Sequence, residues 1–85
     1  ILFKDGLETE GFNFITPPPA KEFDCEVRIK HRQPLQKARA TVLDNGDVRI
    51  VFQEKQRAIA EGQYAVAYYG DICLGGGVIN HSLDI

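Results

Sequence analysis

The chain has 85 residues, 44% of them hydrophobic and 26% charged, which is the size and composition of one small globular domain. No apolar run approaches the roughly 20 residues that span a bilayer, and no signal-peptide pattern opens the chain, so we expect no membrane contact. The net charge of −2 taken alone argues against nucleic acid as a partner. The start at Ile1 suggests a piece of a longer protein.

The first predicted strand is short, Phe12–Ile15, and follows a loose lead-in over residues 1–11. Three consecutive prolines, 17–19, come next; they cannot donate to a strand ladder and favour an extended conformation. We interpret them as a stiff connector inside the domain. The alternative is a recognition peptide for a proline-binding domain.

Two neighbouring segments show the clearest alternation of apolar and polar residues, which predicts strands with one buried face. The first segment is Phe23–Arg32, which Gln33-Pro34 ends, and the second is Gln36–Leu43. Their predicted inward residues are Phe23, Cys25, Val27, Ile29, Ala38, Ala40 and Val42. Asp44-Asn45-Gly46-Asp47 is a strong hairpin signal, and Val48–Phe52 is predicted to return with Arg49 outward.

The last third of the chain predicts a loop over residues 53–62, with a short extended piece near Ala58-Ile59, and then a hairpin. Its strands, Tyr64–Tyr69 and Ile72–Ile79, are joined by Gly70-Asp71. Both are apolar at nearly every position, so we expect both faces to be covered. Residues 80–85 are predicted to be a frayed tail. The whole pattern predicts an all-β fold, a small closed antiparallel β-barrel of about six strands, as one domain over residues 1–85.

No catalytic or metal-binding set is evident. Ser82, the only serine, lies beside His81 in the predicted tail, and His31 has no second ligand at a suitable spacing. Cys25 and Cys73 are expected to be buried reduced thiols; a disulfide would require an oxidising compartment. The triplet 75–77 is glycine, which indicates a close backbone approach or a bulge rather than a phosphate-binding loop.

Charge is distributed unevenly. Residues 27–43 contain five cations and no acid, and Arg49 can extend that set onto the third strand. If the strands pair, the cations form one outward patch suited to phosphates. The candidate RNA-binding residues are Arg28, Lys30, Arg32, Lys37, Arg39 and Arg49. The alternative is a solvated strand face partly neutralised by Glu26.

A second set of candidates lies at strand ends and turns, where side chains can approach base edges: Gln33, Arg57 and Gln63. Aromatic rings that could stack on unpaired bases are few, namely Tyr64, Tyr68, Tyr69 and, as an imidazole, His31. The tyrosines lie in the most apolar strand, so core or rim packing is their default role.

Three motifs resemble the C-terminal domain of the tRNA-specific 2-thiouridylases. Near the start the pair is Asn13-Phe14, and residues 27–33 are closely similar to a basic strand of the family, with His31 in place of the usual tyrosine. The strongest match lies within residues 56–77: Gln56, Ala58, Gly62, Gln63, Ala65, Val66, Tyr69, Asp71, Cys73, Leu74 and the glycine triplet. The chain departs from the family at Lys55 and Glu61, where proline is usual.

The resemblance implies a barrel like those of translation elongation factors and a parent enzyme that places sulfur on the wobble uridine of tRNA. The parent adenylates the uridine with ATP and Mg²⁺ and relays sulfur through a cysteine persulfide, both in a catalytic domain absent here. This domain would hold no cofactor and would not catalyse, and Cys73 would serve packing only. Its implied partners are the anticodon region of tRNA, the parent's catalytic and central domains and a sulfur-donor protein.

The resemblance implies a cytoplasmic location, or a mitochondrial one in a eukaryote. Two other functions remain open. The basic face could dock on the parent's other domains or on a sulfur donor, which would make the chain a protein interaction module. An independent ligand-binding barrel is disfavoured by the filled interior that the apolar pattern predicts.

Overall fold

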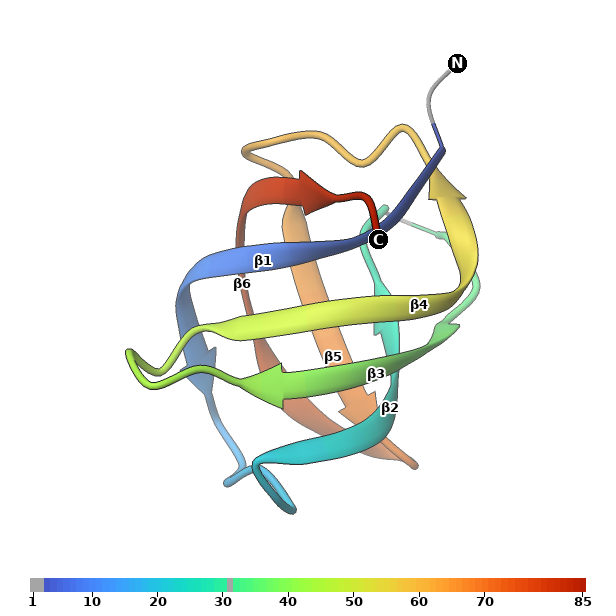
Figure 1. Ribbon diagram of the computed structural model, residues 1–85. Coiled ribbons are helices and arrows are strands. Elements are labelled where there is room, and N and C mark those ends of the chain that lie inside the picture. The colour runs from blue at the N-terminus through green and yellow to red at the C-terminus, as the bar shows by residue number, and fades with distance from the viewer. Residues whose placement is uncertain (1–2, 31) are drawn as a thin grey trace.

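The fold is a closed barrel of six antiparallel strands in the order β1-β4-β3-β2-β5-β6 (Figure 1). The computed structural model describes residues 3–30 and 32–85. The strands are β1 (Phe3–Phe14), β2 (Glu22–Arg28), β3 (Gln36–Val42), β4 (Val48–Arg57), β5 (Tyr64–Tyr69) and β6 (Ile72–Leu83). The predicted all-β barrel is confirmed. The described residues include no helix that is long and apolar enough to cross a membrane.

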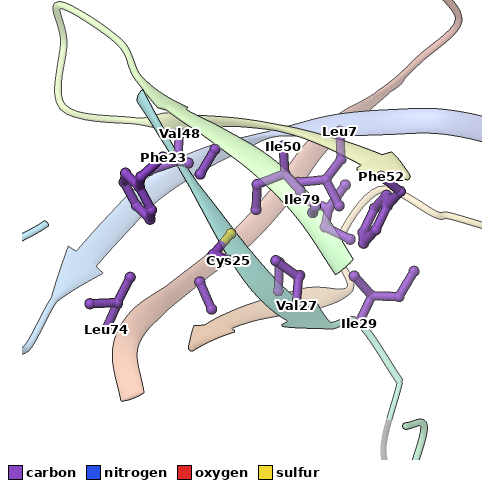
Figure 2. Close-up of a cluster of buried hydrophobic side chains, with 14 residues drawn as sticks. Leu7, Phe23, Cys25, Val27, Ile29, Val48, Ile50, Phe52, Leu74 and Ile79 are labelled. Atoms are coloured by element: carbon purple, nitrogen blue, oxygen red, sulfur yellow. The ribbon is translucent and has the colours of Figure 1, made fainter. Parts of the chain in front are cut away.

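One cluster of apolar side chains fills the barrel, and every strand contributes to it. Figure 2 shows this cluster and labels ten of its residues, among them Leu7, Val27 and Ile50, none of which has any exposed surface. The alternation predicted along β2, β3 and the first half of β4 is confirmed, because the inward residues of these strands belong to this cluster or, in the case of Val42, pack against it. Burying one face of each strand is what a barrel this small requires.

The lead-in predicted over residues 1–11 is wrong from Phe3 onward, because β1 starts there and closes the barrel between β4 and β6. Thr9 is buried, and its hydroxyl oxygen accepts a hydrogen bond from the Val48 amide at 3.0 Å. At Gly6 a Cβ would overlap with the carbonyl oxygen of Ile50, so the glycine permits the close approach of the two strands. Many residues of this segment are polar or charged, so the sequence shows no clear alternation that would predict the strand. Residues 1 and 2 lie outside the described part.

The predicted frayed tail is also wrong. Strand β6 continues to Leu83, which pairs with Gly6 of β1. Beyond the strand, the Lys4 ammonium lies 2.7 Å from a carboxylate oxygen of Asp84, and the Ile85 amide donates to Asp5 at 2.7 Å. The start of β1 and the residues that follow β6 therefore lie side by side (Figure 1).

Strand β4 is longer than predicted and β2 is shorter. The loop expected from residue 53 begins only at Ala58, which has a φ of +57° and is not extended as predicted. The buried side chain of Gln56 attaches the end of β4 to its neighbours. It accepts a hydrogen bond from Gln33 at 3.2 Å and donates one to Gln36 at 3.3 Å. Strand β2 ends at Arg28, although the next residue still packs into the core.

The predicted β5–β6 hairpin is confirmed, but the expectation that both its faces are covered is wrong. Its outward residues Tyr64, Ile72 and Val78 are 53%, 53% and 40% exposed, because a barrel has only one interior. The glycine triplet permits close approach, as predicted. At Gly75, whose φ is +143°, a Cβ would overlap with the carbonyl oxygen of Asn13.

Two further predictions concern the prolines and the cysteines. The prolines at 17–19 lie in the connection between β1 and β2, in agreement with a connector inside the domain. Cys25 and Cys73 are both free thiols, as predicted. The predicted burial is confirmed for Cys25 but is wrong for Cys73, which is half-buried.

Candidate nucleic-acid interface

The outer face of β2 and β3 alternates in charge. The two strands pair as predicted, and their register places Glu26 opposite Lys37 and Asp24 opposite Arg39. The two terminal guanidinium nitrogens of Arg39 lie 3.0 Å from Asp24 and 3.3 Å from Glu22. Hydrogen bonds to these carboxylates, first to Asp24, raise the pKa of Arg39 above its ordinary value. The positive charge of this guanidinium is therefore matched locally.

Arg49 on β4 is paired in the same way. Its guanidinium lies 2.6 Å from a carboxylate oxygen of Glu8 on β1, and His81 on β6 approaches the other oxygen of that carboxylate at 3.4 Å. We call the outer faces of β2, β3 and β4 around Lys37, Arg39 and Arg49 the mixed-charge wall. A groove of about 660 Å³ crosses it, lined by Asp24 and Glu26 as well as by cations.

The remaining predicted cations lie elsewhere, at the end of the barrel where β2 and β4 finish and β3 and β5 begin (Figure 1). The Lys30 ammonium donates to the carbonyl oxygen of Arg57 at 2.7 Å, which joins the two strand ends. Arg32 is exposed and lies in a turn with a φ of +66°, not on a strand face as predicted. Arg28, Lys30, Arg32 and Arg57 are here called the basic end. Within the described residues, no ion pair joins these four to a carboxylate.

A second groove opens beside the basic end, between β2 and β5, with a volume of about 470 Å³. We call it the β2–β5 groove. It is lined by two cations, two tyrosines, one amide and two aliphatic side chains, and by no carboxylate: Arg28, Lys30, Tyr64, Tyr68, Gln63, Ile29 and Val66. The guanidinium carbon of Arg28 lies 5.9 Å from the centre of the Tyr68 ring, a cation–π distance.

Two of the three second-tier candidates, Gln33 and Gln63, have hydrogen-bond partners for their side chains. Gln33 accepts a hydrogen bond from the Ile29 amide at 3.1 Å and donates to Gln56, so its side chain closes the β2–β3 connection. The Gln63 amide oxygen accepts from the Ala60 amide at 3.0 Å while the residue lines the β2–β5 groove. His31, which was considered as a stacking group, lies outside the described residues.

The sequence interpretation did not anticipate this groove. The sequence pattern gives Tyr64 and Tyr68 a default packing role, and it marks Val66 only as part of the family match. The signal that marks them is the apolar residue at every outward position of β5, since a barrel strand ordinarily presents polar groups there.

Nothing in the described part of the chain resembles a metal or catalytic centre. Residues 3–30 and 32–85 contain no group of three histidine, cysteine or acidic side chains that could hold a metal ion. Burial raises the pKa of the Cys25 thiol to about 11, and Asp24 and Glu26 add to the effect. A thiol in this state is a poor nucleophile at neutral pH.

Comparison with known proteins agrees with the fold. Residues 4–79 match the family model described as the aminomethyltransferase beta-barrel domain. The chain is 42% identical over 83 residues to the tRNA-specific 2-thiouridylase MnmA of Marinobacter nauticus, covering 96% of this chain and 21% of that protein. It is 42% identical to MnmA of Halalkalibacterium halodurans (96% and 22%) and 47% identical to MnmA of Stenotrophomonas maltophilia (92% and 21%).

The chain thus spans about a fifth of the length of these relatives. The family match covers all six strands up to Ile79, including the closing strand β1. The chain belongs to the aminomethyltransferase β-barrel domain family, in the form found in the tRNA-specific 2-thiouridylases.

Proposed function

We propose that this barrel is the tRNA-contacting, non-catalytic domain of an ATP-dependent tRNA-uridine 2-sulfurtransferase, and that it meets the anticodon region of tRNA through the basic end. The supporting observation is the separation of charges. Arg39 and Arg49 of the mixed-charge wall are ion-paired with carboxylates, and Lys37 lies opposite Glu26. Within the described residues, by contrast, the cations of the basic end form no ion pair, and the adjoining groove is lined by no carboxylate. Unmatched cations attract phosphates more strongly than matched ones, and phosphate contacts provide most of the affinity for RNA.

The parent's chemistry would take place outside this barrel. ATP and Mg²⁺ would bind the catalytic domain, and the cysteines that relay sulfur would belong there too, since Cys25 is buried with a raised pKa. The proposed location is the cytoplasm. The parent's catalytic and central domains would be partners of this domain together with tRNA.

The test uses two triple variants of the 85-residue chain that change the net charge equally. Lys30→Gln/Arg32→Gln/Arg57→Gln removes three cations of the basic end, and Lys37→Gln/Arg39→Gln/Arg49→Gln removes the three cations of the wall. Binding of labelled tRNA is followed by fluorescence anisotropy between about 50 and 200 mM salt. Circular dichroism of each variant checks that the barrel remains folded.

We expect the basic-end variant to bind tRNA at least about tenfold more weakly and to show a salt slope shallower by about 2 to 3, near one per lost phosphate contact. The wall variant should change the affinity by less than about threefold, because Arg39 and Arg49 are already ion-paired and Lys37 lies opposite Glu26. Equal losses would mean that only net charge matters, and a larger loss in the wall variant would move the interface there. A wild-type chain that does not bind tRNA would remove the RNA role.

The second candidate function is protein docking, on the parent's other domains or on a sulfur donor. It is supported by the apolar residues exposed on the hairpin, Ile72 at 53% and Val78 at 40%. Substituting both with serine would weaken that contact and leave tRNA affinity unchanged, which a pull-down against the parent's remaining domains can measure.

A further inference from the structure

Strand β5 presents a row of apolar side chains to the outside of the barrel. Ala65 and Ala67 point inward and are buried, so alternation places Tyr64, Val66 and Tyr68 on the outer face, where they line the β2–β5 groove. The Tyr64 side chain is packed against β6, since a Cβ at Gly76 would lie only 2.5 Å from its ring carbon Cε2. Tyr64 nevertheless remains 53% exposed, which leaves ring surface available to a ligand.

The side of the groove formed by β2 is cationic. The Arg28 guanidinium lies over the Tyr68 ring, and its Nε is the one buried side-chain polar atom without a hydrogen-bond partner in the described part of the chain. An unpaired buried donor is unfavourable until an acceptor reaches it. Lys30 is held beside it through the Arg57 carbonyl. The groove thus combines an exposed ring with two cations and lacks any lining carboxylate.

We propose that the β2–β5 groove binds one unpaired nucleotide of RNA, with the base stacked on Tyr64 and a neighbouring phosphate held by Arg28 and Lys30. The inference rests on the proposed function and names the subsite through which single-stranded RNA is gripped. A groove of about 470 Å³ lies within the range of small-ligand sites. Aromatic faces and guanidinium planes are the surfaces on which splayed-out bases stack, whereas bases inside a duplex are not accessible to them.

The experiment measures binding of a labelled decauridylate, a ten-base-pair RNA duplex and tRNA to four variants. Tyr64→Leu removes the ring and keeps an apolar side chain, and Tyr64→Phe keeps the ring. Tyr69→Leu is the matched control, because Tyr69 is the other exposed tyrosine of β5, at 46%. It lines the groove that crosses the mixed-charge wall and not the β2–β5 groove. Lys30→Gln removes one cation of the groove.

We expect Tyr64→Leu to bind decauridylate about tenfold more weakly with an unchanged salt slope, since base stacking is not screened by salt. Lys30→Gln should lower that slope by about 0.7, the value for one phosphate contact on a single strand. Tyr64→Phe and Tyr69→Leu should stay within about twofold of the wild type, and Tyr64→Leu should leave duplex affinity unchanged.

Three results would overturn the inference while leaving the proposed function intact. They are equal decauridylate binding by wild type and Tyr64→Leu, an equal loss of duplex binding in Tyr64→Leu, and a wild-type chain that binds tRNA but not decauridylate. In each case the groove would not hold a base, and a protein would become its better occupant. A wild-type chain that binds none of the three RNAs would overturn the inference together with the proposed function.

Discussion

Replacing Leu7 by alanine tests whether the first strand is an integral part of the barrel. The Leu7 side chain has no exposed surface and belongs to the core cluster (Figure 2). Leu→Ala removes three carbon atoms, about 2.4 kcal/mol at about 0.8 kcal/mol for each, and the remaining cavity brings the usual cost to about 3 to 4 kcal/mol. A chain of this length has about 4 to 13 kcal/mol of total stability, so the loss is a large fraction of it.

The assay is urea unfolding followed by far-ultraviolet circular dichroism, with a thermal scan beside it. The midpoint temperature should fall by about 12 to 25 °C. Ile15→Ala is the matched control, because Ile15 directly follows β1 and is 67% exposed; its substitution should cost less than about 0.5 kcal/mol. If Leu7→Ala costs no more than Ile15→Ala, β1 does not contribute to the core and the reasoning is refuted.

The remaining predictions concern the glycine triplet of β6 and the two thiols. Gly75→Ala should destabilise the barrel by at least about 2 kcal/mol in urea unfolding, because its Cβ would overlap with the Asn13 carbonyl, whereas Gly46→Ala, at a φ of +91° in open space, should cost about 1 kcal/mol. At pH 8.5 iodoacetamide should alkylate Cys73 and spare Cys25, as mass spectrometry can check. Burial raises the pKa of Cys25 from 9.0 to about 11, so the unfolded chain releases this proton at a lower pH than the folded chain does. The contribution of the protonated thiol to the free energy of unfolding is therefore present below pH 9 and lost as the pH rises towards 11. Cys25→Ala should make the free energy of unfolding depend less steeply on pH in this range.

The middle of the barrel could be predicted from the sequence, because β2, β3 and the first half of β4 each bury one face and expose the other. The outer strands could not. In β1 the buried Leu7 and Thr9 stand among glycines and charged residues, and its place is set by two partners distant in the sequence. In β6 the segment after Ile79 is polar, and only pairing with β1 extends the strand to Leu83.

The sequence predicted most residues of the candidate site but not how they are arranged on the barrel. Alternation correctly placed Arg39 on an outer face, but it cannot say which acid lies beside that side chain. The β2–β3 register decides that, and the connecting residues 29–35 are too many to fix a register as a two-residue turn would. Arg32 was assigned to a strand that ends at Arg28, because apolar Ile29 continues the alternation beyond the last ladder hydrogen bond.

The contact of Lys4 and Asp5 with Asp84 and Ile85 has a consequence for the folding of the barrel. Lys4 meets Asp84 across 80 positions of sequence, and β1 joins β4 to β6, so the last seam depends on pairings of very high contact order. Such pairings form slowly, since a long loop must close before any contact compensates for the lost chain entropy. While the chain is being synthesised, β1 and β5 each lack a neighbour until β6 has left the ribosome. During that interval their open edges are the part of the molecule most exposed to intermolecular association.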